Sequence, residues 1–145
     1  MKTKNDLKFI GDMAYFSHSK SLYGEIEESK VYDFINKHFS GNVICPNRHL
    51  GELTDKSDYA KIASNADYIF VWSESNHAEL TKGCYMELDA FVIGDIAVNA
   101  ILIEVFGDTI ALRKIVTIHE HDDYTQYDYF GWVESVSLIS SKLDT

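Results

Sequence analysis

Residues 66–93, ADYIFVWSESNHAELTKGCYMELDAFVI, constrain the fold more than any other part of this chain. An apolar run at 68–72 is followed by a polar loop and then by an apolar-periodic segment at 81–93. This order predicts a buried strand, a loop and a helix. In open α/β sheets, ligands bind at the carboxyl ends of such strands. Because Glu87 falls in the first turns of the expected helix, we expect it beside that crevice.

The same alternation of strand and helix continues along the chain. Apolar spacing and stop signals predict helices near 22–39, 55–66 and 81–93. Short apolar runs predict five strands, at 7–10, 43–45, 68–72, 98–105 and 115–118. Residues 13–21 and 47–54 have the composition of loops, and 132–143 has possible helical spacing.

Strands that alternate with helices favour a parallel sheet covered on both faces. With right-handed crossovers, the prediction is a small flavodoxin-like three-layer α/β sandwich with a mostly parallel sheet of about five strands. One proline, no low-complexity tract and no internal repeat argue against a linker. We therefore expect residues 1–145 to form a single domain.

The charge balance limits the class of partner. The net charge is -10, from 23 acidic and 13 basic residues. An acidic surface repels phosphate backbones and anionic membranes, so binding to nucleic acid polymers or to a membrane is not expected. A small nucleoside or nucleotide in a local pocket remains compatible with this charge.

The cysteines and the apolar runs predict a cytoplasmic protein. Cys45 and Cys84 have no CxxC spacing, which fits a reducing compartment better than a disulfide scaffold. The basic N-terminus lacks the apolar core of a signal peptide. The longest apolar run, at 98–106, is too short to span a bilayer.

Glu87 is the first candidate for chemistry. A carboxylate on an apolar-periodic helix costs several kcal/mol if it is buried without a role or a partner. The alternative is a Glu87 on the solvent face of the helix. A well-placed carboxylate can trap a sugar covalently, or stabilise its positive charge, when a glycosidic bond breaks.

The residues around Glu87 resemble those of the nucleoside 2-deoxyribosyltransferase superfamily, which includes the deoxynucleoside-monophosphate N-glycosidases. The matching residues are Ala66-Asp67 at the strand entry and GCYMEL at 83–88. The resemblance covers residues 7–106. It implies a domain of that type in which Glu87 is the nucleophile and Gly83 belongs to the binding loop.

The same resemblance implies roles for other positions. Residues 9–11, Phe-Ile-Gly, resemble the family's first strand and sugar-binding loop, which places Gly11 and Asp12 at the substrate. Asp58 lies near the family's second acidic residue, which contacts the sugar and assists acid-base chemistry. Asp12 is an alternative for protonating the leaving base. Thr81, six residues before Glu87, stands where monophosphate hydrolases have Ser, and so implies a sugar or phosphate contact.

Further candidates follow from the loops and the aromatic residues. Ser73 follows the central strand and could hydrogen-bond a ligand or simply solvate a loop. Tyr15 and Trp72 are candidates for stacking on a nucleobase, with core packing as the alternative. The His and acidic residues at 119–123 are expected to form a solvated loop rather than a metal site. No metal or cofactor is expected.

The function predicted from these features is cleavage or transfer at the N-glycosidic bond of a nucleoside or nucleotide. One alternative is a non-catalytic module that binds or sequesters a nucleotide, supported by the bulky Asp12-Met13 after Gly11. A second is an NAD-cleaving domain of the Toll/interleukin-receptor type. The aromatic, acidic segment 127–131 resembles tails that complete a neighbouring active site in this family. A homo-oligomer is therefore expected, with packing of that segment on its own domain as the alternative.

Overall fold

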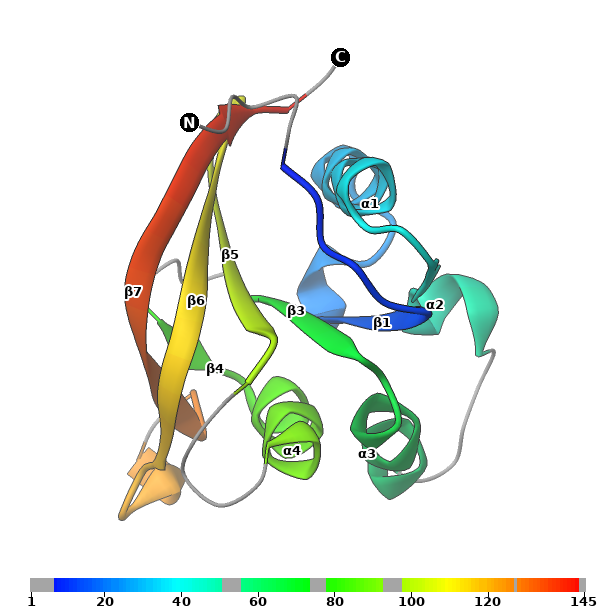
Figure 1. Ribbon diagram of the computed structural model, residues 1–145. Helices are drawn as coiled ribbons and strands as arrows, with labels where there is room; N and C mark the ends of the chain where they lie inside the picture. The colour runs from blue at the N-terminus through cyan, green and yellow to red at the C-terminus, as the bar shows by residue number, and fades with distance from the viewer. Residues whose placement is uncertain (1–6, 51–55, 74–77, 93–97, 127, 144–145) are drawn as a thin grey trace.

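The computed structural model describes residues 7–50, 56–73, 78–92, 98–126 and 128–143. These residues form an α/β fold with one seven-stranded mixed sheet (Figure 1). The strands are β1 (Met13–His18), β2 (Asn42–Ile44), β3 (Tyr68–Trp72), β4 (Glu79–Leu80), β5 (Ala100–Phe106), β6 (Thr109–Glu120) and β7 (Gly131–Lys142). The helices are α1 (Ile26–His38), α2 (Pro46–His49), α3 (Lys56–Ser64) and α4 (Lys82–Phe91), with 3-10 turns η2 (Lys20–Leu22) and η3 (Tyr124–Gln126).

The sheet has a parallel half and an antiparallel half. Its strand order is β2-β1-β3-β5-β6-β7-β4. The first four strands pair in parallel, whereas β5-β6, β6-β7 and β7-β4 are antiparallel. The prediction of a mostly parallel, five-stranded flavodoxin-like sheet is therefore wrong, although the α/β class is confirmed.

The link between β5 and β6 explains this change of direction. Only Gly107 and Asp108 separate the two strands, and Gly107 has a φ of +64°. A parallel connection needs a crossover of about a dozen residues or more, so a two-residue link permits only a hairpin.

The C-terminal segment 132–143 is strand β7, so the helical spacing suggested for it is wrong. Register shifts between Leu112 and Arg113 and between Ile115 and Thr117 interrupt the pairing of β6 with β7. Most of β7 is also exposed on its outer side, including Val136 and Leu138. The apolar residues therefore do not alternate regularly, and the period of two is hidden.

The first strand lies later in the chain than predicted. Phe9 makes only an isolated bridge to Phe39, and β1 occupies residues that we expected to be a loop. Ala14 to His18 are all buried, because helices cover both faces of β1. A strand buried on both faces has no polar-apolar alternation, and its polar Ser17 and His18 imitate a loop.

The central elements agree with the predictions. Strand β3 has the predicted bounds, and β2 and β5 differ from theirs by one or two residues at each end. Helices α1, α3 and α4 lie within the predicted segments, while residues 55 and 93 lie outside the described part of the chain. The expected loop at 47–54 contains the short helix α2.

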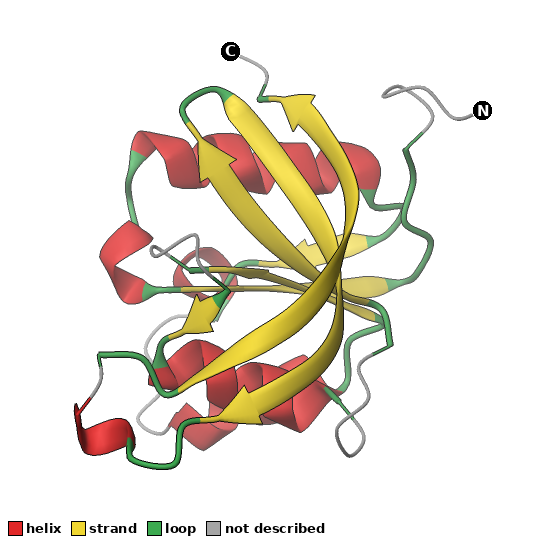
Figure 2. Ribbon diagram, turned by 90° about the vertical axis from the view of Figure 1, so that its left-hand side faces the viewer, coloured by secondary structure: helices red, strands yellow, loops and turns green. Residues whose placement is uncertain are grey.

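Two hydrophobic cores lie on opposite faces of the sheet. Helix α1 covers one face through Val31, Phe34 and Ile35, and α3 and α4 cover the other. Figure 2 shows the long β6–β7 hairpin curving across the molecule beside these layers. Side chains alternate across each strand, so consecutive residues of β1 face different cores.

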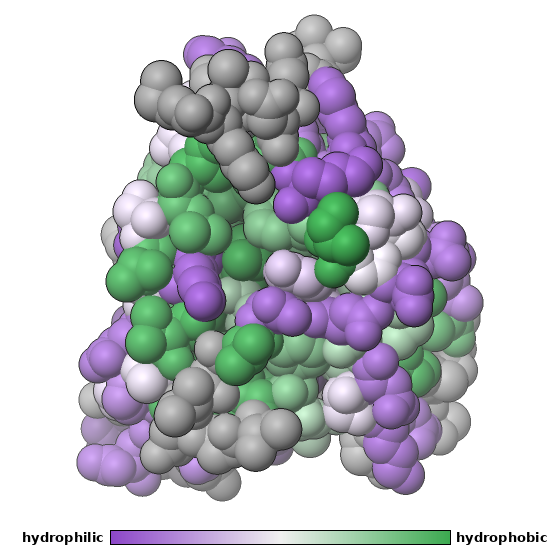
Figure 3. Space-filling model, in the orientation of Figure 1, coloured by the Kyte–Doolittle hydropathy of each residue, from purple (hydrophilic) through white to green (hydrophobic). Residues whose placement is uncertain are grey.

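The surface mixes hydrophilic and hydrophobic residues on the face drawn in Figure 3. Val116, Val136 and Leu138, on the β6–β7 hairpin, are exposed apolar residues. No helix in the described ranges is both long and apolar enough to cross a membrane.

Candidate functional site

Strand β1 lies where the order of the strands in the sheet reverses, because the next two strands in the sequence pair with its opposite edges. β2 pairs with one edge of β1 and β3 with its other edge, both in parallel (Figure 1). The crossovers from β1 to β2 and from β2 to β3 therefore lead to opposite sides of β1. Such a switch point leaves a crevice at the carboxyl ends of the two central strands, where α/β proteins bind ligands.

Alternation along β1 sorts its residues between the two cores. Tyr15 packs with α3 and α4, whereas Phe16 packs with α1. Ser17 bonds to Glu87 of α4, and His18 bonds to Glu28 of α1. The end of β1 therefore supplies polar groups to two separate clusters, one on each face.

Glu87 is buried, with 9% of its surface exposed, and both of its carboxylate oxygens have partners. The Tyr15 hydroxyl donates to Oε2, and the Ser17 hydroxyl donates to Oε1 at 2.7 Å. The Glu87 side chain therefore points at β1, close to the carboxyl end of that strand. The solvent-face alternative for Glu87 is wrong.

Burial controls the electrostatics of this carboxylate. Loss of solvent raises the pKa of Glu87 above its usual value, and the bonds from Tyr15 and Ser17 only partly offset this. Burial and the neighbouring Glu87 charge raise the pKa of Tyr15, so its hydroxyl stays protonated and continues to donate. Burial also raises the pKa of the adjacent Cys84 thiol to about 11, so Cys84 is a neutral group beside the site.

Two buried hydroxyls continue this cluster outward. His18 lies opposite Trp72 in the β1–β3 pairing, so Ser19 and Ser73 are the residues that directly follow these two strands. Among the described residues, neither Ser19 Oγ nor Ser73 Oγ has a hydrogen-bond partner, and both side chains are buried. Buried polar groups in folded proteins are nearly always bonded, so the pair has unused capacity for a ligand.

The N-terminus of α4 borders the same region. Thr81 is the N-cap residue, and its side chain makes no capping hydrogen bond. Gly83 has open space where a Cβ would be, with no heavy atom within 4 Å. The Ser19 hydroxyl lies near the Cys84 thiol, although not in the geometry of a hydrogen bond, which places Ser19 beside this helix. Free N–H groups at a helix start attract anions.

Three predicted site residues lie away from Glu87. Gly11 and Asp12 precede β1, at its amino end, where the Asp12 and Met13 N–H groups donate to the Asp67 carboxylate. Trp72 packs in the α1 core, parallel to Phe16 at 6.3 Å, because its side chain points to the other face of β3. These three residues are not brought together with the carboxylate.

The remaining predicted residues lie on the helices that cover the site face. Asp58 is in the first turn of α3 and half-buried, and the partners of both Glu87 oxygens are Tyr15 and Ser17 rather than Asp58. Thr81 and Gly83 lie at the start of α4, and Ser73 lies at the end of β3. Tyr15, Ser73, Thr81, Gly83 and Glu87 therefore remain as one group, with Asp58 on the neighbouring helix.

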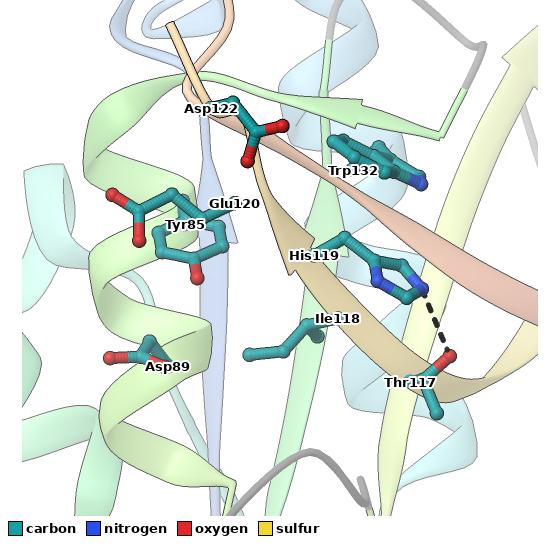
Figure 4. Close-up of a pocket in the computed structure, with 8 residues that line it drawn as sticks. All are labelled: Tyr85, Asp89, Thr117, Ile118, His119, Glu120, Asp122 and Trp132. Atoms are coloured by element: carbon teal, nitrogen blue, oxygen red, sulfur yellow. Dashed lines mark hydrogen bonds between the residues drawn. The ribbon is translucent and has the colours of Figure 1, made fainter. Parts of the chain in front are cut away.

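A separate groove of about 580 Å³ lies on the other side of α4 (Figure 4). Tyr85 and Asp89 contribute to it from α4, and the rest of the lining comes from β6, from Asp122 in the turn after β6, and from Trp132 of β7. Residues 85 and 89 are one helical turn apart, whereas 87 points in nearly the opposite direction. The groove is therefore distinct from the Glu87 cluster.

The segments at 119–123 and 127–131 lie near this groove. His119 is the penultimate residue of β6, stacks on Trp132 at 5.0 Å and has its Nε2 at 3.2 Å from a Glu134 carboxylate oxygen, so it is not part of a loop. Residue 127 lies outside the described residues, but Phe130 packs on Tyr85 at 5.1 Å. Phe130, from the described part of this segment, therefore packs on its own domain.

Sequence reasoning missed two features of the site. Ser17 and Ser19 alternate with Tyr15 on one face, a signal that becomes readable only when residues 13–18 are placed in a strand. Glu104 of β5 is buried on the same face of the sheet and pairs with Arg113 of β6 at 2.6 Å. Arg113 becomes its neighbour through the β5–β6 hairpin, which the sequence did not predict.

The arrangement defines a class of site: a buried carboxylate, oriented by two hydroxyl donors, at the switch point of an α/β sheet. Such a group can act as a nucleophile or as a stabiliser of positive charge. Comparison with protein-family models, curated proteins and solved structures gave no match to this chain.

Proposed function

We propose that this protein is an enzyme that cleaves or transfers at the N-glycosidic bond of a nucleoside or nucleotide. The observation that carries the proposal is the Glu87 carboxylate, buried at the switch point and held by Tyr15 and Ser17. A structural carboxylate at this position would be costly, whereas a reacting one needs both the burial and the orientation.

The reaction follows from the chemistry of a glycosyl bond. A Glu87 oxygen bonds to the anomeric carbon while the carbon–nitrogen bond breaks and its electron pair leaves with the base. The departing base takes up a proton. Water or a second base then attacks the anomeric carbon and releases the carboxylate, with overall retention of configuration.

The polar groups next to Glu87 suit the rest of such a substrate. The free hydroxyls of Ser19 and Ser73 can bond sugar hydroxyls or a 5′-phosphate. Thr81 and the open space at Gly83 leave the start of α4 accessible to an anion. Asp58 on α3 remains the candidate for assisting the leaving base.

The placement of Gly11 and Asp12 bears on the rival function. The bulk of Asp12 and Met13 supported a non-catalytic nucleotide-binding module only if these residues lined the pocket. They lie at the amino end of β1, away from Glu87, so they do not narrow this site. The support for the enzyme is accordingly stronger than the support for the module.

The test is release of free base from a panel of deoxynucleosides, their 5′-monophosphates and NAD. We expect turnover with at least one deoxynucleoside or deoxynucleotide, and a loss of about a thousandfold or more in kcat in Glu87→Gln. Asp89→Asn, a change on the opposite side of α4, is the matched control and should keep full activity. Nucleotide binding without turnover in the wild type would favour the non-catalytic nucleotide-binding module. Turnover of NAD alone would favour an NAD-cleaving domain.

A homo-oligomeric state and a reducing, cytoplasmic setting are parts of the same proposal. Both cysteines are free thiols, as expected in such a compartment. Light scattering coupled to gel filtration measures the number of subunits directly, and a monomeric mass with full activity would contradict the oligomer.

A further inference from the structure

A second polar cluster lies behind β1, on the face covered by α1. It contains His18 at the end of β1, Glu28 in α1 and Cys45 directly after β2. One ligand atom from each residue lies within 4.8 Å of the others, and all three residues are buried. Among the described residues, this is the group of His, Cys and acidic side chains that gathers in this way.

The ring of His18 is oriented as the rings of metal-binding histidines are. Its Nδ1–H donates to the Phe16 carbonyl at 3.1 Å, which fixes the ring and aims Nε2 at the cluster. Metal-ligating histidines nearly always donate their other N–H to a carbonyl or carboxylate in this manner. Stacking on Phe16 at 4.0 Å and contact with Tyr23 at 4.8 Å hold the ring in place.

Glu28 is oriented by a second set of donors. Its Oε1 accepts from the Gly24 N–H at 3.1 Å and from Asn47 Nδ2 at 3.2 Å. These bonds leave Oε2 to face His18 Nε2, at 2.5 Å. The Cys45 thiol donates to Asn47 Oδ1 at 3.1 Å, so Asn47 links the thiol to the carboxylate.

We propose that His18, Glu28 and Cys45 form a binding site for one Zn²⁺ ion. Imidazole nitrogen, carboxylate oxygen and thiolate sulfur are the donors that zinc takes in proteins, and three protein ligands leave a fourth position for water. The soft sulfur and the nitrogen disfavour Mg²⁺ and Ca²⁺, which take oxygen ligands. His18 Nε2 and Glu28 Oε2 would move apart by about 1 Å to share an ion at ordinary zinc bond lengths.

The charges of the three side chains suit a divalent ion. Because Nδ1 donates to Phe16, the other ring nitrogen, Nε2, faces the Glu28 carboxylate. A Zn²⁺ ion held by a neutral imidazole, one carboxylate and one thiolate would leave the buried cluster without net charge.

The site would support the glycosidic site without taking part in its chemistry. His18 and Ser17 are neighbours in β1, and their side chains point to opposite faces. An ion that joins β1, α1 and the end of β2 would hold the strand end that carries Ser17. The zinc proposal does not depend on any activity of Glu87.

The experiment titrates metal-free full-length protein with Zn²⁺ alone and with Co²⁺ alone. We expect one Zn²⁺ per chain and, with Co²⁺, a thiolate-to-cobalt charge-transfer band in the near ultraviolet. Cys45→Ala should remove the band, while Cys84→Ala, which removes the other buried thiol, should keep it.

Glu28→Gln is the second variant, because the amide can still accept from Gly24 and Asn47. It should weaken zinc binding by about 10–100-fold with an unchanged circular dichroism spectrum. His119→Ala, which removes an exposed His beside a carboxylate, should leave the affinity unchanged. A failure to bind Zn²⁺ at one per chain, or a cobalt band that survives in Cys45→Ala, would overturn the proposal whether or not base release is observed.

Discussion

Glu87 is the residue at which stability and function oppose each other. Its carboxylate is buried, and two hydroxyl donors compensate only part of the lost hydration, so its pKa is raised. A protein under selection for stability alone would replace such a group by an apolar or neutral one. Its retention is expected where the charge itself reacts.

The first prediction concerns stability and pH. A raised folded-state pKa means that the folded protein binds the Glu87 proton more tightly than the unfolded chain does. The resulting stability is present below the unfolded value of 4.5 and is lost as pH rises through the folded value. Glu87→Gln should therefore be more stable than the wild type at pH 8, with the difference disappearing near pH 4. Urea unfolding at both pH values measures this, and a variant less stable at pH 8 would contradict it.

The second prediction concerns the two donors to Glu87. Tyr15 and Ser17 lower its pKa, so removing either bond should raise that pKa further. In the proposed reaction Glu87 must be ionised to act as the nucleophile, so Tyr15→Phe and Ser17→Ala should shift the acid limb of kcat/KM to higher pH and lower its plateau about 10–100-fold. Ser140→Ala on the exposed side of β7 is the control. A loss of rate without a shift of the limb would assign these residues to packing only.

The sequence identifies Glu87 but not its partners. Gly83 and the apolar spacing of α4 mark a helix start near a strand end, which is a local signal. Tyr15 and Ser17 are about seventy residues away, at separations of 72 and 70 in the chain, and only the β1–β3 pairing brings them near. Contacts of this kind depend on the register of the sheet, which single-sequence patterns do not fix.

At the scale of elements, β1 is held to α1 by the His18–Glu28 pair. Burial lowers the pKa of His18 despite its bond to Glu28. Burial raises the pKa of Glu28, but bonds from His18, Gly24 and Asn47 outweigh it, and the net shift is downward. Both lowered values mean that the folded state binds fewer protons than the unfolded chain, so the pair's stabilisation is lost as pH falls.

The third prediction follows from removing one partner of this pair. His18→Ala should destabilise metal-free protein by about 3–5 kcal/mol at pH 7, because the buried Glu28 carboxylate loses the partner of its Oε2. Glu27→Ala, an exposed neighbour in α1, should change stability by less than about 0.5 kcal/mol. Chemical denaturation with a chelator present measures both, and equal effects in the two variants would refute the role of the pair.

The fourth prediction compares Gly83, in the first turn of α4, with Gly131, which begins β7 and lies against Tyr85 of α4. A Cβ on Gly131 would lie 2.4 Å from the His119 carbonyl and 2.5 Å from the Tyr85 ring, so Gly131→Ala should cost about 1–3 kcal/mol. Gly83→Ala meets open space and lies in a helix, so it should add about 0.5–1 kcal/mol. If a substrate anion approaches the start of α4, the same Gly83 variant should raise KM. Thermal unfolding and kinetics separate these effects, and a Gly131→Ala protein as stable as the wild type would contradict the close approach.

The elements that sequence predicts well are those with one dominant local pattern. Strand β3 is a bounded apolar run, and α1 and α4 have helical spacing with stop signals. The hairpin β6–β7 fails because its bulges and its exposed outer face remove the alternation on which prediction depends. β1 fails for the opposite reason, since both of its faces are buried.

At the scale of the whole molecule, the sheet combines a doubly wound half with a meander. The parallel strands β2-β1-β3-β5 create the switch point, and the antiparallel strands curve beside α4 and complete its packing. The first half could be predicted from strand and helix alternation. The antiparallel half could not be predicted. The two-residue turn at 107–108 lies between two apolar strands, and their apolar runs do not show whether the strands are parallel or antiparallel.

The fifth prediction also belongs to the whole molecule, because it concerns the net charge of -10. Like charges on a compact surface repel, and salt screens that repulsion over about 10 Å at 0.1 M ionic strength. Ion pairs such as Lys142–Asp108, at 3.2 Å, are exposed and contribute little in return. Raising NaCl from about 0.01 to 0.15 M should therefore increase Tm by a few degrees, roughly 2–4 °C.

A charge variant separates repulsion from other effects of salt. Asp122→Asn removes one exposed negative charge, so it should raise Tm at low salt and have little effect at high salt. An uncharged solute at equal osmolarity should not reproduce this convergence, since it leaves the charges unscreened. If Tm falls with added NaCl instead, attraction within ion pairs outweighs the excess negative charge. In that case, the excess of negative charge would also be too weak a reason to exclude polyanions as partners.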